Sequence, residues 1–418
     1  MDYISPTSID ARLAEEVALS RNVIALIIPF IILFPVTASA QETFRIGAPL
    51  PMTGAGAAFG EKFKKAYTMA IDEINAKGGV NGRKLQLVID DTQAQPPLAV
   101  TSVKKLVTSD NVVALIGGWA SGVALAVAPL AQELRTPYLL DHPALDDITR
   151  QGNDCVFRLQ PTTGMYSAAL EDFLINVVYE RQKKPIKAAY LYVDNAFGQG
   201  VAKYGIMPFF KEHSDRFVLG VCEAYSEKAL DYKPLLLKVK NASPDVIIFT
   251  SYLTDGILLG KQAKEVGLTA KLVSGTGAGH SMQDIYEKSG GAVEGYFSSG
   301  PWHGDVTSPA WKKWRGDWEA KYGYPPGEHE IEGYVAIQVL ARALESVKSR
   351  DVVRQREELR VGLKRTTMVT IFGPVKFENF DGYTNQNRAY NLTALGQWIG
   401  GKLYQVWPKR VAERDPKY

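Results

Sequence analysis

The sequence is poor in the two residue types that most often bind metals or form covalent cross-links. Its 418 residues include only two cysteines and five histidines, and none has the spacing of a zinc-binding motif. Two cysteines cannot build a disulfide framework. Cys155 and Cys222 lie in apolar, strand-like runs, so we expect two buried free thiols, with a disulfide between them as the alternative. We expect no metal site and no cofactor.

The chain also has no marked excess of charge of either sign. Lys and Arg number 48 and Asp and Glu 45, which gives a net charge of +3, and the basic residues form no stripe. This balance argues against nucleic acid as a partner. Apolar residues make up 46% of the chain, and its length allows two domains of ordinary size, each with its own core.

The sequence contains no hydrophobic run long enough to cross a membrane comfortably. The longest, VIALIIPFIILFPV at residues 23–36, has 14 residues, whereas a spanning helix needs about 20. Arg21 precedes it and an A-x-A pattern ending at Ala40 follows, which predicts a signal peptide over residues 1–40 with cleavage after Ala40. The acidic stretch before Arg21 fits such a peptide poorly, and an uncleaved membrane anchor is the alternative.

After the leader, apolar runs of strand length alternate with helical patterns. The run FRIGA is followed by a helical pattern over residues 61–77, in which apolar residues recur every three or four positions. The runs LQLVID, VVALIGG and PYLL continue this alternation. Repeated strand–helix–strand units predict an α/β fold with mainly parallel sheets, covered by helices on both faces.

The alternation restarts after residue 160 and predicts a second lobe of the same kind. Its strand-like runs are KAAYLYVD, RFVLGVCEAY, DVIIFTSY and KLVSGT. Two further helices are expected over residues 309–322 and 329–347, followed by aromatic-rich strands around residues 375–380 and 392–406. A tail of this kind could complete both lobes instead of forming a third.

Two loops that follow predicted strands resemble enzyme motifs without matching them. In GAGAAFG, Phe59 stands where a dinucleotide fingerprint requires a glycine, and no acidic residue follows at the right spacing. In GWASG, Trp119 stands where the nucleophile elbow of hydrolases requires a glycine. We therefore do not expect an enzyme, and a secreted serine hydrolase is kept as an alternative.

Ser121 is better suited to hold an anion. We expect it at or near the start of a helix, where free backbone N–H groups and the helix dipole favour a carboxylate. Gly117, Gly118 and Gly122 allow a ligand to approach the backbone closely. The alternative is that Ser121 only caps its helix. Aromatic residues in or near the strand-end loops would form an apolar clamp if they converge from both lobes: Phe59, Trp119, Phe197, Tyr252 and Trp302.

Several stretches together resemble one known family. They are IGAPLPMTGAGAAFG, AIDEINAKGGVNGRKLQLVIDD, IGGWASG, YVDNAFGQG and KQAKEVGL, within residues 44–406. The chain resembles the periplasmic solute-binding proteins of ABC importers, of the branched-chain-amino-acid (Leu/Ile/Val-binding) type. The resemblance implies a type I periplasmic-binding-protein fold, in which three hinge crossovers join two doubly wound parallel-sheet lobes. We expect lobe 1 to comprise residues 41–160 and 296–370, and lobe 2 residues 161–295 and 371–418.

The resemblance also implies a ligand site in the cleft between the lobes. Ser121 and the adjacent backbone match the family's carboxylate-binding turn, Phe59 matches an aromatic cover, and Phe197 and Tyr252 match the aromatic closers of the second lobe. The complete set of expected ligand contacts is Phe59, Trp119, Ala120, Ser121, His142, Ala144, Phe197, Tyr252 and Thr276.

Two positions depart from the amino-acid binders of this family. Ala144 stands where they carry a threonine hydroxyl for the ligand's ammonium, and Thr276 stands where they carry its acidic partner. A buried ammonium without a carboxylate is costly. We therefore favour an aromatic or keto acid without an α-ammonium, whose far end bonds to His142 or Thr276. A branched-chain or other aliphatic amino acid, with Asp141 as its ammonium partner, is the alternative.

The function expected from the resemblance is that of a monomeric periplasmic receptor. It would bind one small organic carboxylate and deliver it to an inner-membrane ABC permease. A ligand-sensing module of the same fold, acting on a signalling partner, is the alternative.

Overall fold

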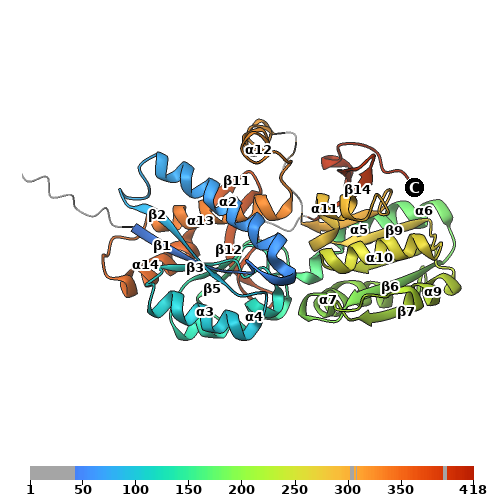
Figure 1. Ribbon diagram of the computed structural model, residues 1–418, viewed down its shortest axis with the longest axis horizontal. Helices are drawn as coiled ribbons and strands as arrows, with labels where there is room; N and C mark the ends of the chain where they lie inside the picture. The colour runs from blue at the N-terminus through green and yellow to red at the C-terminus, as the bar shows by residue number, and fades with distance from the viewer. Residues whose placement is uncertain (1–42, 302–305, 307, 389–392) are drawn as a thin grey trace, which may run out of the picture. The chain divides into compact units, whose positions relative to one another are not determined.

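A first sheet of eight strands contains both the beginning and a late part of the described chain (Figure 1). The computed structural model describes residues 43–301, 306, 308–388 and 393–418, so the predicted signal peptide lies outside the described residues. The strand order is β11-β12-β13-β5-β4-β3-β1-β2. The strands are β1 (Thr43–Leu50), β2 (Lys84–Asp91), β3 (Ala114–Ile116), β4 (Tyr138–Leu140), β5 (Val156–Arg158), β11 (Thr367–Thr370), β12 (Gly373–Phe380) and β13 (Tyr383–Asn387).

Helices cover this first sheet on both faces. Helix α3 packs against α4, and α13 packs against α2 and α14. Neighbouring strands from β2 to β13 pair in parallel, whereas β11, β12 and β13 pair with one another in antiparallel fashion. The helices are α2 (Ala57–Ala76), α3 (Pro96–Thr108), α4 (Ser121–Glu133), α12 (Pro309–Tyr322), α13 (Glu328–Leu344) and α14 (Val352–Arg365).

A second sheet of seven strands has the order β15-β14-β10-β9-β8-β6-β7. Its strands pair in parallel from β7 to β10, and β14 and β15 add an antiparallel edge. The strands are β6 (Ile186–Val193), β7 (Phe217–Tyr225), β8 (Val246–Thr250), β9 (Leu272–Thr276), β10 (Phe297–Pro301), β14 (Thr393–Ile399) and β15 (Lys402–Trp407). Its helices include α5 (Ala168–Phe173), α7 (Ala196–Val201), α8 (Met207–Glu212), α9 (Lys233–Ala242), α10 (Leu253–Glu265) and α11 (Gln283–Lys288).

The two sheets confirm the predicted α/β fold of two doubly wound lobes. Among the described strands, the chain passes from one sheet to the other after β5, after β10 and after β13. The strand partition differs from the expected lobe boundaries at two places. Strand β10 belongs to the second sheet, because it pairs with β9, and β12 and β13 belong to the first, because β13 pairs with β5. Helix α14 and strand β13 were not predicted.

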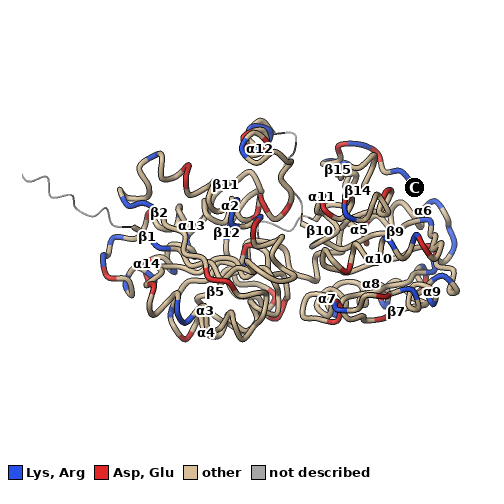
Figure 2. Tube along the Cα trace, in the orientation of Figure 1, with Lys and Arg blue, Asp and Glu red and all other residues tan. Residues whose placement is uncertain are grey.

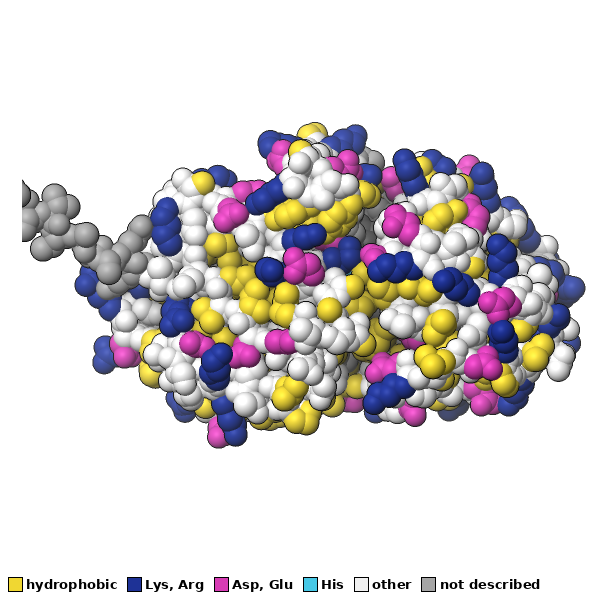
Figure 3. Space-filling view, viewed as in Figure 1, with side chains coloured by type: hydrophobic (Ala, Val, Ile, Leu, Met, Phe, Trp, Pro, Cys, Tyr) yellow, Lys and Arg dark blue, Asp and Glu magenta, His cyan; other side chains and the backbone are white. Residues whose placement is uncertain are grey.

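The surface agrees with the balanced composition. Figures 2 and 3 show Lys and Arg interspersed with Asp and Glu, with no large patch of one sign on the face in view. None of the described helices is both long enough and apolar enough to span a bilayer. Cys155 and Cys222 are free thiols; Cys155 is buried as expected, whereas Cys222 is only partly buried. Burial raises the pKa of Cys155 to about 11.

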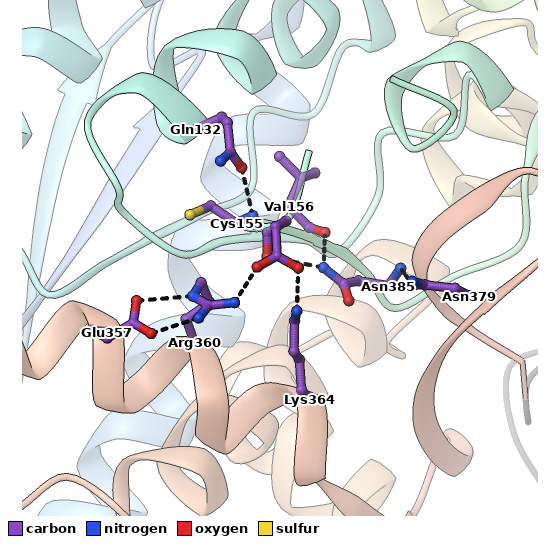
Figure 4. Close-up of polar contacts among 9 residues, drawn as sticks. Gln132, Cys155, Val156, Glu357, Arg360, Lys364, Asn379 and Asn385 are labelled. Carbon is purple, nitrogen blue, oxygen red and sulfur yellow. Dashed lines mark hydrogen bonds and ion pairs between the residues drawn. The ribbon is translucent and has the colours of Figure 1, made fainter. Parts of the chain in front are cut away.

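Polar contacts fasten α14 to the first sheet (Figure 4). Arg360 and Lys364 of α14 donate to the Asp154 carboxylate, just before β5. Asn385 of β13 donates to the backbone carbonyls of Asp154 at 3.1 Å and Val156 at 3.2 Å. The late strands and the last long helix are therefore tied to the strand from which the chain first leaves this sheet.

The glycines of the opening loop have a packing role. A Cβ at Gly60 would lie 2.1 Å from the Pro51 carbonyl oxygen, so only glycine allows α2 to start so close to the end of β1. A Cβ at Gly56 would lie 2.8 Å from Pro51 Cβ and 3.0 Å from Trp119 Cζ3. The spacing of these glycines, which resembles a dinucleotide fingerprint, is therefore explained by their close contacts with Pro51 and Trp119.

We predict that Gly60→Ala lowers the free energy of unfolding by about 1–3 kcal/mol, because the new methyl group meets a backbone carbonyl that cannot move aside cheaply. Gly316→Ala in α12 is the matched control, since a Cβ at this exposed position has no atom within 4 Å. It should raise stability by about 0.5–1 kcal/mol through helix propensity. Urea denaturation measures both changes, and a Gly60→Ala protein as stable as the parent would contradict the packing role.

Candidate functional site

The turn between β3 and α4 has an unusual backbone. Gly117, Gly118 and Trp119 have φ angles of 89°, 96° and 44°. The glycines adopt this region without penalty, whereas a tryptophan there costs about 1–3 kcal/mol. The Tyr138 hydroxyl donates to the Gly117 carbonyl at 2.8 Å and holds the turn. Backbone strain of this kind is concentrated at functional sites.

Ser121 is the first residue of α4, but it does not cap this helix. The N-cap is Ala120, and no side-chain hydrogen bond caps the helix start. Ser121 Oγ instead accepts a hydrogen bond from Leu145 N at 3.3 Å, and the side chain is buried. The alternative that Ser121 only caps α4 is therefore wrong. The hydroxyl hydrogen remains to donate to a further acceptor, beside the first N–H groups of α4, which have no intrahelical partners.

Ser121 lines a small cavity to which both sheets contribute. The space left between its walls is about 10 Å³, roughly enough for one water molecule. Side chains, most of them aromatic, occupy the space around it. The lining residues are Trp119, Ser121, His142, Ala144, Tyr166, Phe197 and Tyr252.

Aromatic rings from the two lobes meet at this cavity. The Trp119 ring stacks on Phe59, with centroids 4.3 Å apart, and lies 4.8 Å from the Tyr252 ring. Tyr252 in turn stacks on Phe197 at 5.6 Å, and the Tyr166 ring lies 5.7 Å from Phe197. The aromatic residues expected to form a clamp thus make a continuous row of rings that joins the loops after β3, β6 and β8, and Trp302, the remaining expected member, lies outside the described residues.

Trp119 also brings a polar group to the cavity. Its side chain is 5% exposed, and Nε1 has no hydrogen-bond partner in the part of the chain that the structure describes. A buried indole N–H without an acceptor is costly. Trp119 and Ser121 both line this cavity, and each has a polar hydrogen available to an anionic or carbonyl oxygen.

The loop after β4 carries a buried polar network. The Tyr67 hydroxyl donates to Asp141, and His142 Nδ1 lies 2.7 Å from Glu332 Oε2. Burial raises the pKa of Asp141 to about 6, although the Tyr67 hydrogen bond lowers it in part, and burial lowers the pKa of His142. Burial also raises the pKa of Glu332 well above its usual range.

Next to this network, the first turn of α13 supplies further buried polar groups. Glu328 and His329 are each 1% exposed, and burial raises the pKa of Glu328 to about 8. Both residues line a second, larger cavity of about 780 Å³, which also reaches Trp398 of β14 and Lys62 of α2. The His329 ring lies 4.5 Å from His142, which lines the smaller cavity, and 5.1 Å from Phe59.

Six of the nine expected ligand contacts line the small cavity. Trp119, Ser121, His142, Ala144, Phe197 and Tyr252 line it.

Three expected contacts are placed elsewhere. Phe59 supports Trp119 from behind, and Ala120 only precedes the helix. The Thr276 hydroxyl lies 2.6 Å from the Thr250 hydroxyl, inside the second lobe.

Sequence reasoning missed Tyr166, Glu328 and His329. Tyr166 directly follows a short 3-10 turn at Thr163–Met165 and precedes α5, so it lies outside the strand-end loops on which the sequence analysis concentrated. The run EHEIE at residues 328–332 contained a signal, because acids and a histidine on one helical turn are unusual for a buried position.

Comparison with known proteins agrees with this architecture. A family model described as periplasmic binding protein matches residues 43–402. The Leu/Ile/Val-binding protein homolog 7 of Brucella melitensis biotype 1 is 28% identical over 408 residues, which cover 94% of this chain and 98% of the relative.

Two solved structures are similar in fold. One is the branched-chain amino acid transporter substrate-binding protein LivJ of Streptococcus pneumoniae in complex with isoleucine, with a TM-score of 0.75, 20% identity, and coverage of 87% of this chain and 98% of that one. The other is an R. palustris ABC transporter solute-binding protein in complex with benzoate, with a TM-score of 0.74, 21% identity, and coverage of 87% and 95%. The resemblance to the Leu/Ile/Val-binding type is confirmed, and the chain belongs to the periplasmic binding protein family.

Proposed function

We propose that the chain is the solute receptor of a branched-chain-amino-acid-type ABC importer, and that it binds a small organic carboxylate between its two lobes. The observation that carries the proposal is the cavity at which Ser121 and Trp119 of the first lobe face Phe197 and Tyr252 of the second. The carboxylate would accept hydrogen bonds from the Ser121 hydroxyl, the Trp119 indole and the first amides of α4.

The lining of the cavity favours a ligand without an ammonium group. Of the described residues that line it, none carries a carboxylate. Asp141, which would pair with the ammonium if the ligand were an amino acid, accepts a hydrogen bond from Tyr67 and is not part of the lining. The aromatic walls suit the flat apolar body of an aromatic acid. Because the similar solved structures include complexes with isoleucine and with benzoate, an amino acid is the competing ligand class.

Ligand entry would require the lobes to separate. The Trp119 and Tyr252 rings lie 4.8 Å apart, and the remaining space is about 10 Å³. The lobes would close by hinge motion at the crossovers, and a ligand that contacts both lobes would stabilise the closed arrangement. The closed form would then dock, as a monomer in the periplasm, on an inner-membrane permease. No described contact favours the alternatives of a signalling module or a serine hydrolase. Ser121 Oγ accepts a hydrogen bond from Leu145 N, which gives no support to a role as a nucleophile.

The first prediction concerns the ligand class. Calorimetric titration of the purified protein with benzoate, cinnamate and L-leucine should give at least tenfold tighter binding for one of the two aromatic acids than for leucine, because the lining offers donors for a carboxylate and no acid for an ammonium. Tighter binding of leucine would show that the ligand is an amino acid.

A second prediction tests the carboxylate turn. Ser121→Ala should weaken binding of the preferred acid about 10- to 100-fold, the loss expected for one hydrogen bond to a charged group. Ser102→Ala is the matched control, since Ser102 is also buried, lies on α3 and has an Oγ without a hydrogen-bond partner among the described residues. Equal affinities of the two variants would place the carboxylate elsewhere.

A third prediction isolates the indole N–H. Trp119→Phe retains a ring that can stack on Phe59 but removes the donor, so affinity should fall about fivefold or more. Trp314→Phe is the control, because Trp314 is likewise 5% exposed, with an Nε1 that lacks a partner in the described part of the chain. If both substitutions leave the binding isotherm unchanged, Trp119 does not donate to the ligand.

A further inference from the structure

Three buried side chains at the edge of the cleft have the composition of a transition-metal site. His142 follows β4, and Glu328 and His329 begin α13. One potential ligand atom from each lies within 4.8 Å of those of the other two. Two imidazoles and one carboxylate form a ligand set that zinc and related divalent ions prefer, whereas calcium and magnesium require mostly oxygen ligands.

The surroundings of His142 fit a metal ligand. Its Nδ1 lies 2.7 Å from Glu332 Oε2, one helical turn after Glu328 on α13. When Glu332 is ionised, as it would be beside a bound cation, it accepts from Nδ1–H, orients the ring and leaves Nε2 as the basic nitrogen. Metal-bound histidines almost always have such a carboxylate or carbonyl partner. Glu332 therefore acts as the supporting group that a bound ion would need.

Glu328 supplies an independent indication of a cation. Its side chain is 1% exposed, and Oε1 has no hydrogen-bond partner in the part of the chain that the structure describes. This oxygen lies 3.7 Å from His329 Nε2. A buried carboxylate oxygen without a donor is costly, and a metal ion would satisfy it.

The three ligand atoms are close to the separation that a metal ion requires, and a cavity gives access to two of these residues. Ligand atoms about 2.1 Å from a tetrahedral zinc ion lie about 3.4 Å from one another, so side-chain shifts of about 1 Å would complete the site. Gly300 lies directly beside the site, since a Cβ there would lie 3.3 Å from Glu328 Oε2. Glu328 and His329 border the larger cavity, through which an ion can reach them.

We propose that His142, Glu328 and His329 bind one divalent transition-metal ion of the zinc class, and that Glu332 orients His142. The fourth coordination position faces the cavities and is filled by water or by an oxygen of a bound solute. The site shares His142 with the lining of the Ser121 cavity, but Glu328 and His329 do not line that cavity, and zinc binding is measured without a carboxylate ligand. The two proposals can therefore fail independently.

The test is a zinc titration of the full-length protein after chelator treatment, in competition with a chromophoric chelator. We expect one equivalent of Zn²⁺ per chain. Glu328→Gln and His329→Gln should weaken binding at least 100-fold, and Glu332→Gln about 10- to 100-fold. Glu330→Gln is the matched control on the same helical turn, because Glu330 is equally buried but is paired with Lys62 Nζ at 2.7 Å. It should retain zinc affinity within threefold.

A spectroscopic readout guards against loss of folding in the variants. Co²⁺ in place of Zn²⁺ should give the visible absorption of a four-coordinate N/O site in the parent and in Glu330→Gln, and lose it in Glu328→Gln and His329→Gln. Ser121→Ala should bind zinc as the parent does, whatever its affinity for carboxylates. Substoichiometric zinc in the parent, or unchanged affinity in the Glu328 and His329 variants, would overturn the proposal.

Discussion

The candidate site depends on the close approach of two tyrosine hydroxyls to Gly117 and Gly118, which have no Cβ atoms. A Cβ at Gly117 would lie 2.7 Å from Tyr67 Oη, and one at Gly118 would lie 2.4 Å from Tyr138 Oη. Any other residue type at either position would push the turn away from α2 and β4. Because the glycines let the turn sit so deep, the strained Trp119 places its ring between Phe59 and Tyr252, and α4 begins at the cavity wall.

Helix α13 connects this turn with the rest of the cleft. It packs on α2, the helix that carries both Phe59 and Tyr67. Its first turn places acids where the helix dipole favours negative charge, beside His142. One helix therefore supports the aromatic stack from one side and supplies the ionisable groups of the cleft from the other. A change in its packing would reach both parts of the site.

The sequence predicted the features that depend on neighbouring residues, namely the strands, the helices and the loops at the strand ends. The strand-end loops were identified correctly because parallel strands end at one edge of a sheet, and six expected contacts, including Ser121 and Tyr252, line one cavity. Thr276 does not line this cavity, and its contact with Thr250 on the adjacent strand could be recognised only once β8 and β9 pair. The cluster of His142 with Glu328 could not be predicted from spacing, since the two residues lie far apart in sequence and meet only in three dimensions. The lobe boundaries differed for the same reason, because strand partners decide sheet membership.

The repeated crossing between sheets has a consequence for how the molecule can be made. Strand β13, near the end of the chain, pairs with β5, and β14 completes a sheet that begins with β6. Neither lobe therefore corresponds to a continuous gene segment that could be expressed alone. A nascent chain has to be almost fully synthesised before either sheet can close, and these pairings between strands distant in sequence carry the largest loop-closure entropy.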